Sequence, residues 1–334
     1  MSNPIISIIT PVYNRPTLVA EAIVSVLSQT NPNWEYILID DGSTDNTWEV
    51  LESYSAKDER IKVFKRDREP KGANRCRNMG AEIAASEYLF FLDSDDLIGD
   101  TFVETRTKYI ELYPEMDYIV FPEATLDNKA EGWFPEKKIF IKNEKDLIRF
   151  FKRDHPWLTS GPIWKKKTFL HLNGFNEELQ IGQDWDIHVR ALFYPHKYIK
   201  ICLNVVDVFK FKDIKHNSIS NSNNLLFTIN NKQAGLNHLL QNSYIRLFLK
   251  TDNETRLAFL KYYFTLAASY STEYNDCSIG KKMLGLFKNY ELLKFNEWTI
   301  WVLYFTPIVH RNKYIKRLFE GVVYNWFKDL YLLW

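Results

Sequence analysis

The chain has 334 residues, 46% of them hydrophobic, and a formal net charge of +1 at pH 7. This composition is sufficient for a sizeable core in one large domain or two ordinary ones, and we expect no nucleic-acid partner. The three cysteines, Cys76, Cys202 and Cys277, are too few and too scattered for a disulfide framework or a zinc site, so we expect free thiols in a reducing compartment.

The charge is divided unevenly along the chain. Residues 222–334 contain 14 Lys or Arg and 8 Asp or Glu, which leaves residues 1–221 with 29 basic and 34 acidic side chains. Such asymmetry indicates two regions with different partners. The N-terminus shows no secretion signal, and no uncharged apolar run approaches the roughly 18 residues that a membrane span requires. We therefore expect a cytoplasmic protein.

Short apolar runs alternate with helical patterns through the first hundred residues. We predict strands at residues 5–10, 35–39, 61–64 and 88–92, and helices over residues 45–53 and 72–85. A further helix, capped by Thr17, is expected after the first strand. Pro11 is expected to end the first strand. This alternation is typical of a doubly wound α/β fold with a mostly parallel sheet.

Three polar clusters follow predicted strands, at residues 11–14, 40–43 and 93–96. In such sheets ligands bind beyond the carboxyl ends of the strands, so we expect the three clusters to converge there. Asp93, Asp95 and Asp96 place like charges side by side, which is unfavourable unless a cation neutralises them. The sequence thus leaves two alternatives, a site for a hard divalent cation such as Mg²⁺ or a solvated turn that caps a helix.

The later part of the chain is less regular. Residues 100–180 give no clean assignment, whereas residues 235–249 and 255–271 fit helices. The Asn-rich residues 217–231 predict a linker. We therefore expect a helical region to follow the α/β domain.

Six motifs occur in a fixed order along residues 4–220. They are Thr10-Pro11-Val12-Tyr13-Asn14, Asp40-Asp41-Gly42-Ser43-Thr44-Asp45, Lys71-Gly72-Ala73-Asn74-Arg75-Cys76-Arg77-Asn78-Met79-Gly80, Phe91-Leu92-Asp93-Ser94-Asp95-Asp96, Gly174-Phe175-Asn176-Glu177 and Gly182-Gln183-Asp184-Trp185. Taken together, they resemble the family 2 glycosyltransferases, which are inverting enzymes with the GT-A fold, of the bacterial surface-polysaccharide type. The resemblance implies a GT-A catalytic domain over residues 1–221 and a helical C-terminal region over residues 222–334.

The resemblance implies that the first loop, with Pro11, Tyr13 and Asn14, and the carboxylate of Asp41 bind the base and ribose of a nucleotide. The Tyr13 ring would stack on uracil and Asp41 would accept the uracil N–H; the alternative for Tyr13 is a packed core side chain. Asp40 is expected to serve the turn by accepting backbone N–H groups.

Two cations beside the third predicted helix, Lys71 and Arg77, are expected to meet the base or its phosphates. Helical spacing separates Arg75 from Arg77 by about 200°, so both cannot face one site, and Arg75 is expected to be a solvated surface charge. Lys210 and Lys212 are weaker candidates for phosphate contacts.

The resemblance also implies the metal site, which would hold Mn²⁺ or Mg²⁺. Asp95 would ligate the ion, Asp93 would contact the ribose or the metal shell, and Asp96 would lie behind them or cap the next helix. His216 would approach the metal or the diphosphate, although a lone histidine is often an ordinary surface or core residue.

By the same resemblance, Asp184 is the general base that takes the proton from the acceptor hydroxyl. Gln183 stands where many relatives have Glu, which removes a neighbouring charge and leaves the base in place. Asp186 is a rival, but it faces elsewhere if the segment is helical. The alternative for both carboxylates is the ordinary enrichment of acids at a helix N-terminus.

Aromatic side chains and cations are interleaved in residues 297–334. This pattern is typical of a helix at an anionic membrane surface. The alternatives are a helical subdomain packed on the catalytic domain and a dimer contact. Lipid-linked acceptors, which related enzymes use, would agree with peripheral contact at the inner face of the cytoplasmic membrane.

The predicted function is transfer of a sugar from a nucleotide-sugar donor, with uridine diphosphate as the expected carrier, to a hydroxyl of a cell-surface glycan or a lipid-linked oligosaccharide. A sugar-phosphate nucleotidyltransferase is one rival, but its Gly-rich phosphate loop is absent after the first predicted strand. The other rival is a catalytically silent nucleotide-sugar-binding scaffold subunit, against which the intact Asp95 and Asp184 argue.

Overall fold

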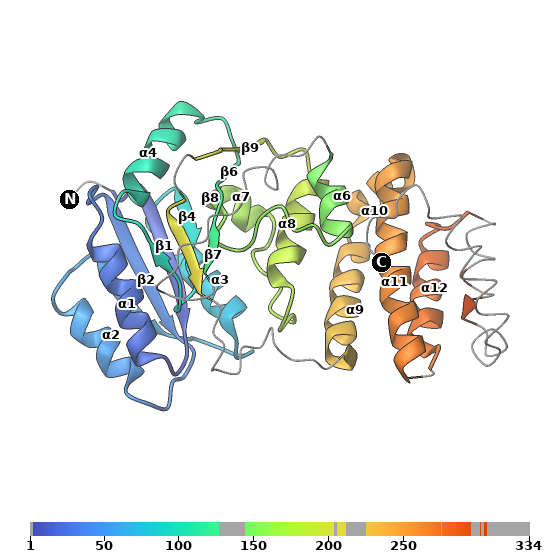
Figure 1. Cartoon of the computed structure of the whole chain (residues 1–334), viewed down its shortest axis with the longest axis horizontal. Helices are drawn as coiled ribbons and strands as arrows, with labels where there is room; N and C mark the ends of the chain where they lie inside the picture. Colours follow the sequence, from blue (N-terminus) through green and yellow to red (C-terminus); the bar gives the residue numbers. More distant parts are fainter. Residues whose placement is uncertain are drawn as a thin grey trace. The chain divides into compact units, whose positions relative to one another are not determined.

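The computed structural model describes residues 3–126, 144–203, 206–211, 225–274, 276–294, 301 and 304–305. The chain divides into two compact units (Figure 1). The first unit comprises residues 1–143 and 155–219, and the second comprises residues 144–154 and 220–334. The assignment of catalysis to the first predicted domain and of membrane or partner contacts to the second stays a prediction.

A seven-stranded sheet forms the centre of the first unit, in the order β3-β2-β1-β4-β8-β6-β9. Its strands are β1 (Ile6–Val12), β2 (Trp34–Asp40), β3 (Ile61–Lys65), β4 (Tyr88–Phe91), β6 (Tyr118–Val120), β8 (Pro162–Lys165) and β9 (Tyr198–Lys200). Strand β8 is antiparallel to β4 and β6, and the other pairings are parallel. The predicted mostly parallel α/β sheet is therefore confirmed.

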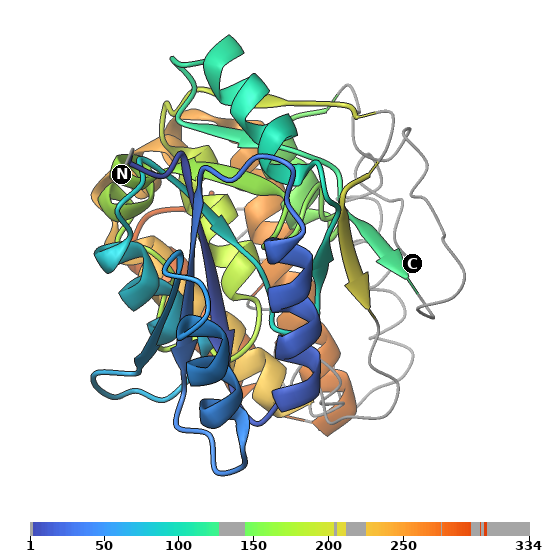
Figure 2. The same ribbon diagram turned by 90° about the vertical axis from the view of Figure 1, so that its left-hand side faces the viewer.

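A second sheet of three short strands lies in the same unit. Its order is β5-β10-β7, with β5 (Leu97–Ile98), β10 (Val208–Phe211) and β7 (Ala124–Leu126). Strand β10 is antiparallel to β5 and parallel to β7, and the yellow β10 and green β7 run side by side in Figure 2. Because β5 directly follows residues 93–96, this sheet brings β10 next to the acidic turn.

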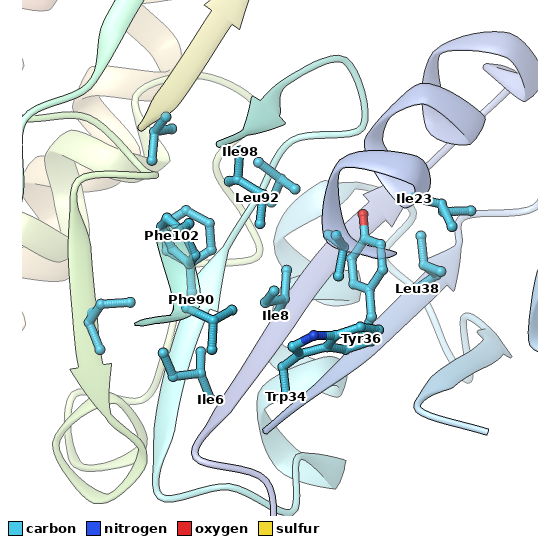
Figure 3. Close-up of a cluster of buried hydrophobic side chains, with 14 of the residues drawn as sticks. Ile6, Ile8, Ile23, Trp34, Tyr36, Leu38, Phe90, Leu92, Ile98 and Phe102 are labelled. Carbon is cyan, nitrogen blue, oxygen red and sulfur yellow. The ribbon is translucent and has the colours of Figure 1, made fainter. Parts of the chain in front are cut away.

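Helices cover the faces of the large sheet. They are α1 (Pro16–Leu27), α2 (Thr47–Ser55), α3 (Ala73–Ile83), α4 (Phe102–Leu112), α7 (Lys166–His171) and α8 (Gln183–Phe193). The strands alternate their side chains between the two faces. Ile6 and Ile8 pack with Ile23 of α1 and Phe102 of α4 in one core cluster (Figure 3), whereas Ile9 faces α3.

Close packing of α3 on β1 depends on Gly80. A Cβ atom built at Gly80 would lie 2.4 Å from Cγ2 of Ile9, a fully buried β-branched side chain that has little room to move. We expect Gly80→Ala to lower the free energy of unfolding by about 1–3 kcal/mol, as overpacking does. Urea denaturation measures this, and Gly285→Ala on α12 (Ser278–Asn289), where no atom lies within 4 Å, is the matched control. Equal stability of the Gly80 variant and the wild type would contradict the close contact.

Several predicted boundaries in the first unit are corrected. Pro11 does not end β1, because the strand continues through it to Val12. Helix α1 begins at Pro16 with Arg15, not Thr17, at the N-cap position, and the fixed φ of proline suits the first helical position. The remaining predicted strands and helices of this half are present with ends shifted by one or two residues.

The described part of the second unit is largely helical. The helices that the structure gives there are α6 (Asp146–Phe151), α9 (Leu225–Gln241), α10 (Ser243–Thr251), α11 (Asn253–Tyr274) and α12, and α11 contacts each of the other four. The helix predicted at 235–249 is interrupted at Asn242, whose side-chain oxygen accepts the N–H groups of Tyr244 and Ile245 and so caps α10. Of the predicted linker, residues 225–231 belong to α9 and residues 217–224 lie outside the described residues.

Three aromatic side chains of the predicted membrane-associated tail are described, and all three are buried. Trp301, Tyr304 and Phe305 pack on Phe264, with ring centroids 4.9, 5.0 and 5.5 Å away. These three side chains therefore pack within the second unit, and contact of the tail with a membrane, the catalytic domain or a dimer partner stays a prediction. Among the residues that the structure describes, no helix combines the length and apolarity that crossing a membrane requires.

Candidate functional site

The three polar clusters converge as predicted. Because β2, β1 and β4 are adjacent and parallel, their carboxyl ends share one edge of the sheet. The N–H of Asp41 donates to the carbonyl of Val12 at 2.8 Å, which joins the first two clusters. Arg15 follows the first cluster and pairs with Asp95 of the third, with 2.5 Å between its guanidinium nitrogen and the Asp95 Oδ2.

Two residues of these loops mainly shape the backbone. Asp40 accepts the N–H groups of Gly42 and Ser43, each at 3.1 Å to Oδ2, which confirms its predicted role in the turn. Asn14, with a φ of 50°, accepts the N–H of Thr44 at 2.8 Å through its side-chain oxygen. Asn14 therefore fixes the first loop against the second.

The side chains predicted to bind the base lie near Asp41, where the second loop meets the first. The Asp41 Oδ1 accepts from Arg66 Nε at 2.7 Å and from the N–H of Gly72 at 3.1 Å, so the carboxylate anchors the start of α3. Tyr13 is 41% exposed, which excludes the alternative of a packed core tyrosine. The Lys71 Nζ lies 3.5 Å from the centroid of the Tyr13 ring, a cation–π contact.

Arg75 corrects a prediction. It is not a solvated surface charge but a buried side chain, 3% exposed, whose guanidinium pairs with Asp67 at 2.6 Å, Glu82 at 3.3 Å and Glu177 at 3.4 Å. The argument from helical spacing is right only in that Arg75 and Arg77 point in different directions from the helix; it does not predict that Arg75 is buried. Arg77, also buried, points instead to Asp93, and its Nη2 donates to the Asp93 Oδ1 at 2.6 Å.

The acidic turn is held by cations from three segments. Burial would raise the pKa of the Asp93 carboxyl, but Arg77, Lys210 and, to a smaller extent, Arg15 outweigh it and lower the pKa below the ordinary value. The neighbouring Asp96 is 2% exposed, and its pKa is raised well above the ordinary value because burial outweighs the attraction of Lys210. These opposite pKa shifts indicate that the Asp93 carboxyl ionises more readily than the Asp96 carboxyl.

Lys210 of β10 interacts with the carboxylates of the acidic turn, Asp93 and Asp96, and with those of Glu123 and Asp184. Its Nζ is 3.8 Å from Asp93 Oδ2 and 3.8 Å from Asp96 Oδ2. Burial opposes the charge, but Asp96, Glu123, Asp93 and Asp184 together raise the pKa of the Lys210 ammonium. Lys210 is therefore charged at neutral pH.

The predicted base, Asp184, stands at the start of α8. Gly182 precedes the helix in the left-handed conformation, with a φ of 69°, and the Asp184 Oδ1 accepts the N–H of Trp185 at 2.7 Å. Burial would raise the pKa of Asp184, but His188, that N–H, His155 and Lys210 lower it below the ordinary value. Asp184 is therefore ionised at neutral pH, as a general base must be.

Asp186 is excluded as an equal rival by its surroundings. Its carboxylate is fully buried and pairs with Arg190 at 2.8 Å, and Arg190 Nη2 also donates to the carbonyl of Gly174 at 2.7 Å. Asp186 therefore serves packing between α8 and the preceding loop, and it faces away from Asp184 as predicted.

The sequence analysis did not identify two residues that interact with the charged groups of the site, Glu123 and His188. Glu123 accepts the N–H of Leu158 at 2.6 Å and the hydroxyl of Ser160 at 2.7 Å, and burial raises its pKa. His188 lies one turn after Asp184, and burial lowers its pKa to about 4 although the Asp184 carboxylate opposes this. Its spacing of four residues from Asp184 was the one available signal. The candidates His216 and Lys212 lie outside the described residues.

The residues present fit a metal only in part. Within the described residues, no three His, Cys, Asp or Glu side chains gather as a ligand set. A protein-only cage is therefore absent from this part of the chain. Asp95, with a side chain 22% exposed and one ion-pair partner, suits the other arrangement, in which one or two carboxylates hold Mg²⁺ or a similar ion together with substrate phosphates.

Comparison with known proteins shows a similarity to one family of enzymes. The sequence profile of glycosyl transferase family 2 matches residues 7–166. Glycosyltransferase GlyG of Streptococcus pneumoniae is 36% identical over 107 residues, covering 32% of this chain and 35% of that protein. The GalNAc(5)-diNAcBac-PP-undecaprenol beta-1,3-glucosyltransferase of Campylobacter jejuni is 30% identical over 206 residues, covering 59% of this chain and 64% of that protein. Across five such relatives, the match spans 17–44% of their lengths.

Solved structures share the fold. S. aureus TarS 1–349 in complex with UDP-GlcNAc superposes with a TM-score of 0.60 and 16% identity, over 89% of this chain and 90% of that chain. The mannosyltransferase PcManGT from Pyrobaculum calidifontis, in complex with GDP-Man and Mn²⁺, gives a TM-score of 0.51 and 12% identity, over 93% and 86% of the two chains. At these identities the likeness concerns the fold alone. The profile match over residues 7–166, the curated glycosyltransferase relatives and the shared fold together make this chain similar to the glycosyltransferases of family 2.

Proposed function

We propose that this protein is an inverting glycosyltransferase that moves a sugar from a nucleotide-sugar donor to an acceptor hydroxyl. One observation carries the proposal: the acidic turn with Asp93 and the carboxylate of Asp184 both interact with the same partly buried cation, Lys210. A donor-binding group and a proton acceptor are thereby brought into one constellation, which the family's chemistry requires.

The proposed donor is a uridine diphosphate sugar. The family relation and the UDP-GlcNAc complex of TarS, a protein of the same fold, support this choice. Tyr13 would stack on the base, with Pro11 and Asn14 shaping the loop beneath it. Asp41 would accept the base N–H, and Lys71, which lies over the Tyr13 ring, would turn to the diphosphate. Arg77 would act by holding Asp93 against the ribose.

The proposed reaction is a single displacement at the anomeric carbon. The acceptor oxygen attacks from the side opposite the diphosphate, a new C–O bond forms, and the bond to the phosphate oxygen breaks. The hydroxyl proton passes to an oxygen of the Asp184 carboxylate, and the electron pair leaves with the nucleoside diphosphate. A base so placed typically contributes about 10²–10⁴-fold to the rate.

The proposed acceptor is a lipid-linked or cell-surface glycan. The Campylobacter jejuni relative, whose name gives an undecaprenol-linked glycan as its acceptor, supports this class. The same class would place the enzyme at the inner face of the cytoplasmic membrane. Peripheral contact through the C-terminal region would then use side chains other than the buried Trp301, Tyr304 and Phe305.

Mn²⁺ or Mg²⁺ is the proposed cofactor, with Asp95 as the protein ligand, Asp93 nearby and His216 as a further candidate. When bound beside the diphosphate, such an ion stabilises the charge of the leaving group. PcManGT, which shares the fold, was solved with Mn²⁺. The protein would supply Asp95 as a ligand, and Arg15, which pairs with Asp95 in the structure, would move away from it.

Competition between Arg15 and a metal ion for the Asp95 carboxylate gives a prediction. The Arg15 guanidinium occupies Asp95 Oδ2 at 2.5 Å, and both side chains are partly exposed, so an ion must displace a pair worth about 1 kcal/mol or less. We expect Arg15→Ala to bind Mn²⁺ without nucleotide up to about fivefold more tightly. Electron paramagnetic resonance titration of free Mn²⁺ measures this. Arg60→Ala, which removes a cation paired with Asp58, is the control, and unchanged or weaker Mn²⁺ binding by the Arg15 variant would refute the competition.

Two rivals remain distinguishable. A silent scaffold subunit would bind a nucleotide sugar but transfer nothing, and a sugar-phosphate nucleotidyltransferase would release pyrophosphate from a nucleoside triphosphate. A thermal-shift screen of nucleotide sugars, with and without Mn²⁺, tests the proposal first. We expect a UDP-sugar to raise the melting temperature more with Mn²⁺ than without it. Stabilisation by nucleoside triphosphates but by no nucleotide sugar would point to the nucleotidyltransferase.

A further inference from the structure

An asparagine of α3, Asn74, contacts both the acidic turn's partner and the chain that leads to Asp184. Its side chain is buried, and its Oδ1 accepts from Arg77 Nη1 at 3.3 Å. The same Arg77 guanidinium donates through Nη2 to the Asp93 Oδ1 at 2.6 Å. The Asn74 Nδ2 donates to the carbonyl of Asn176 at 2.9 Å and to that of residue 179 at 2.7 Å. One buried amide therefore joins the Arg77–Asp93 pair to the segment before α8.

The neighbours of the Asn74 side chain require both a donor and an acceptor. The two backbone carbonyls only accept hydrogen bonds, and the Arg77 guanidinium only donates them. An amide offers a donor and an acceptor on one short side chain, whereas aspartate would only accept and leucine would do neither. Either replacement would therefore remove at least one of the hydrogen bonds that Asn74 makes here.

The loop of residues 174–179 is held by further side chains from both helices that flank it. Asn78, one turn after Asn74 on α3, donates to the carbonyl of Phe175 at 2.9 Å and accepts the N–H of Phe175 at 2.8 Å. From α8, Arg190 Nη2 donates to the carbonyl of Gly174 at 2.7 Å. The loop is therefore fixed to α3 and to α8 at once, and it leads directly into the start of α8.

From this arrangement we propose that Asn74 is a positioning residue, which fixes Asp184 relative to Asp93 through the loop of residues 174–179. Asp184 lies in the first turn of α8, so its position depends on the segment that leads into the helix. Transfer requires the proton acceptor and the donor to keep one relative geometry, and a displacement of about 1 Å lowers a rate by up to about 10²-fold. The inference rests on the proposed function, and it assigns to Asn74 no contact with substrate.

Hydrogen–deuterium exchange of the free protein is the first test, and it does not depend on activity. Asn74→Asp keeps an oxygen for Arg77 but removes the N–H groups that the two carbonyls accept. We expect the amides of residues 174–182 to exchange about two- to tenfold faster in this variant, which corresponds to the net worth of one hydrogen bond. Asn237→Asp makes the same change at an exposed position of α9 and is the matched control. Unchanged exchange in Asn74→Asp would overturn the inference.

The second test measures whether binding at the Asp93 side reaches the loop, which an asparagine that only supports the fold would not transmit. With UDP and Mn²⁺ as the probe, we expect exchange of residues 174–186 to slow by about fivefold or more in the wild type. This protection should disappear in Asn74→Asp. By linkage, the dissociation constant of UDP should rise by no more than about the factor of protection that is lost. Equal protection in the variant and the wild type would overturn the inference.

The kinetic consequence is a loss in kcat. At a temperature where Asn74→Asp is folded, we expect its kcat of transfer to fall by about 10- to 100-fold. A residue that only supports the fold would lower the melting temperature and leave kcat of the folded enzyme unchanged. Asn74→Leu, whose side chain is of similar size, gives the same three measurements if the aspartate variant does not fold. A wild-type kcat in a folded variant would refute the role in positioning.

These outcomes separate this inference from the proposed function. Faster exchange of the loop in variants of a protein that neither binds UDP nor transfers sugar would support the hold of Asn74 on the loop and refute the glycosyltransferase. An active enzyme whose Asn74 variants keep the wild-type exchange, the protection by UDP and kcat would refute the role of Asn74 and leave the proposed reaction standing.

Discussion

Asp184→Asn is expected to lower kcat by about 10²–10⁴-fold while the dissociation constant of the nucleotide sugar stays within about twofold. An amide cannot take the proton of the acceptor hydroxyl, but it keeps the size of the carboxylate and its contact with the N–H of Trp185. Rapid-quench measurement of transfer and calorimetric measurement of donor binding separate the two effects. Transfer at the wild-type rate would end the proposed mechanism.

Asp186→Asn in the same helix is the matched control. This substitution breaks a fully buried ion pair with Arg190, so we expect a loss of about 3–5 kcal/mol in the free energy of unfolding. At temperatures where the variant remains folded, its kcat should stay near that of the wild type. Asp184→Asn should therefore lower kcat, whereas Asp186→Asn should lower the free energy of unfolding.

The pKa of Asp184 adds a pH expectation. Because it is lowered in the folded protein, the carboxylate is ionised throughout the neutral range, and Asp184 should produce no acid limb in kcat above about pH 5. A lowered pKa also means that ionised Asp184 stabilises the fold above its ordinary pKa, and that this contribution is lost as the pH falls through the folded value. An acid limb near pH 7 would assign the base to another group.

Asp95→Asn is the second variant with a large expected effect. One charge pair at about 4 Å is worth roughly 4 kcal/mol at an effective dielectric near 20, so we expect transfer to fall by up to about 10³-fold. The additional rise in melting temperature that Mn²⁺ gives to the donor complex should disappear. These two readouts together test the metal as well as the residue.

Asp100→Asn controls for the lost charge, because Asp100 is an exposed carboxylate a few residues further along the chain. Its transfer rate and its response to Mn²⁺ should match the wild type. If Asp95→Asn keeps both the rate and the Mn²⁺ response, Asp95 does not hold the ion. If no form of the protein responds to Mn²⁺ but transfer proceeds, Arg15, Arg77 and Lys210 already neutralise the acidic turn sufficiently.

The alternation of short apolar runs and helical patterns was enough to predict the large sheet, because a buried parallel strand and an amphipathic helix leave different periodicities in the sequence. The edge where Tyr13, Asp41 and Asp93 meet followed from the same pattern, since parallel strands share their carboxyl edge. Local chemistry also predicted Asp40 correctly, because its partners, Gly42 and Ser43, are two and three residues away.

The partners of the cations could not be predicted in this way. Helical spacing gave the direction of Arg75 relative to Arg77, but its burial depends on Asp67, Glu82 and Glu177, which come from three separate segments. In the same way, nothing near Lys210 in the sequence indicates Asp96 or Glu123, which lie more than eighty residues away. Such neighbours are set by strand pairing across the small sheet.

The sequence by itself therefore determined the α/β architecture, the resemblance to the family and the edge of the sheet at which the proposed site lies, because these depend on periodicity and on residues close together in the chain. Only the tertiary structure decided which charges are buried and which are paired. Electrostatic interactions depend on distance in space and on exclusion of water, and both arise when segments remote in sequence pack together. Lys210, which belongs to a four-residue strand, acquires its acidic neighbours from that packing alone.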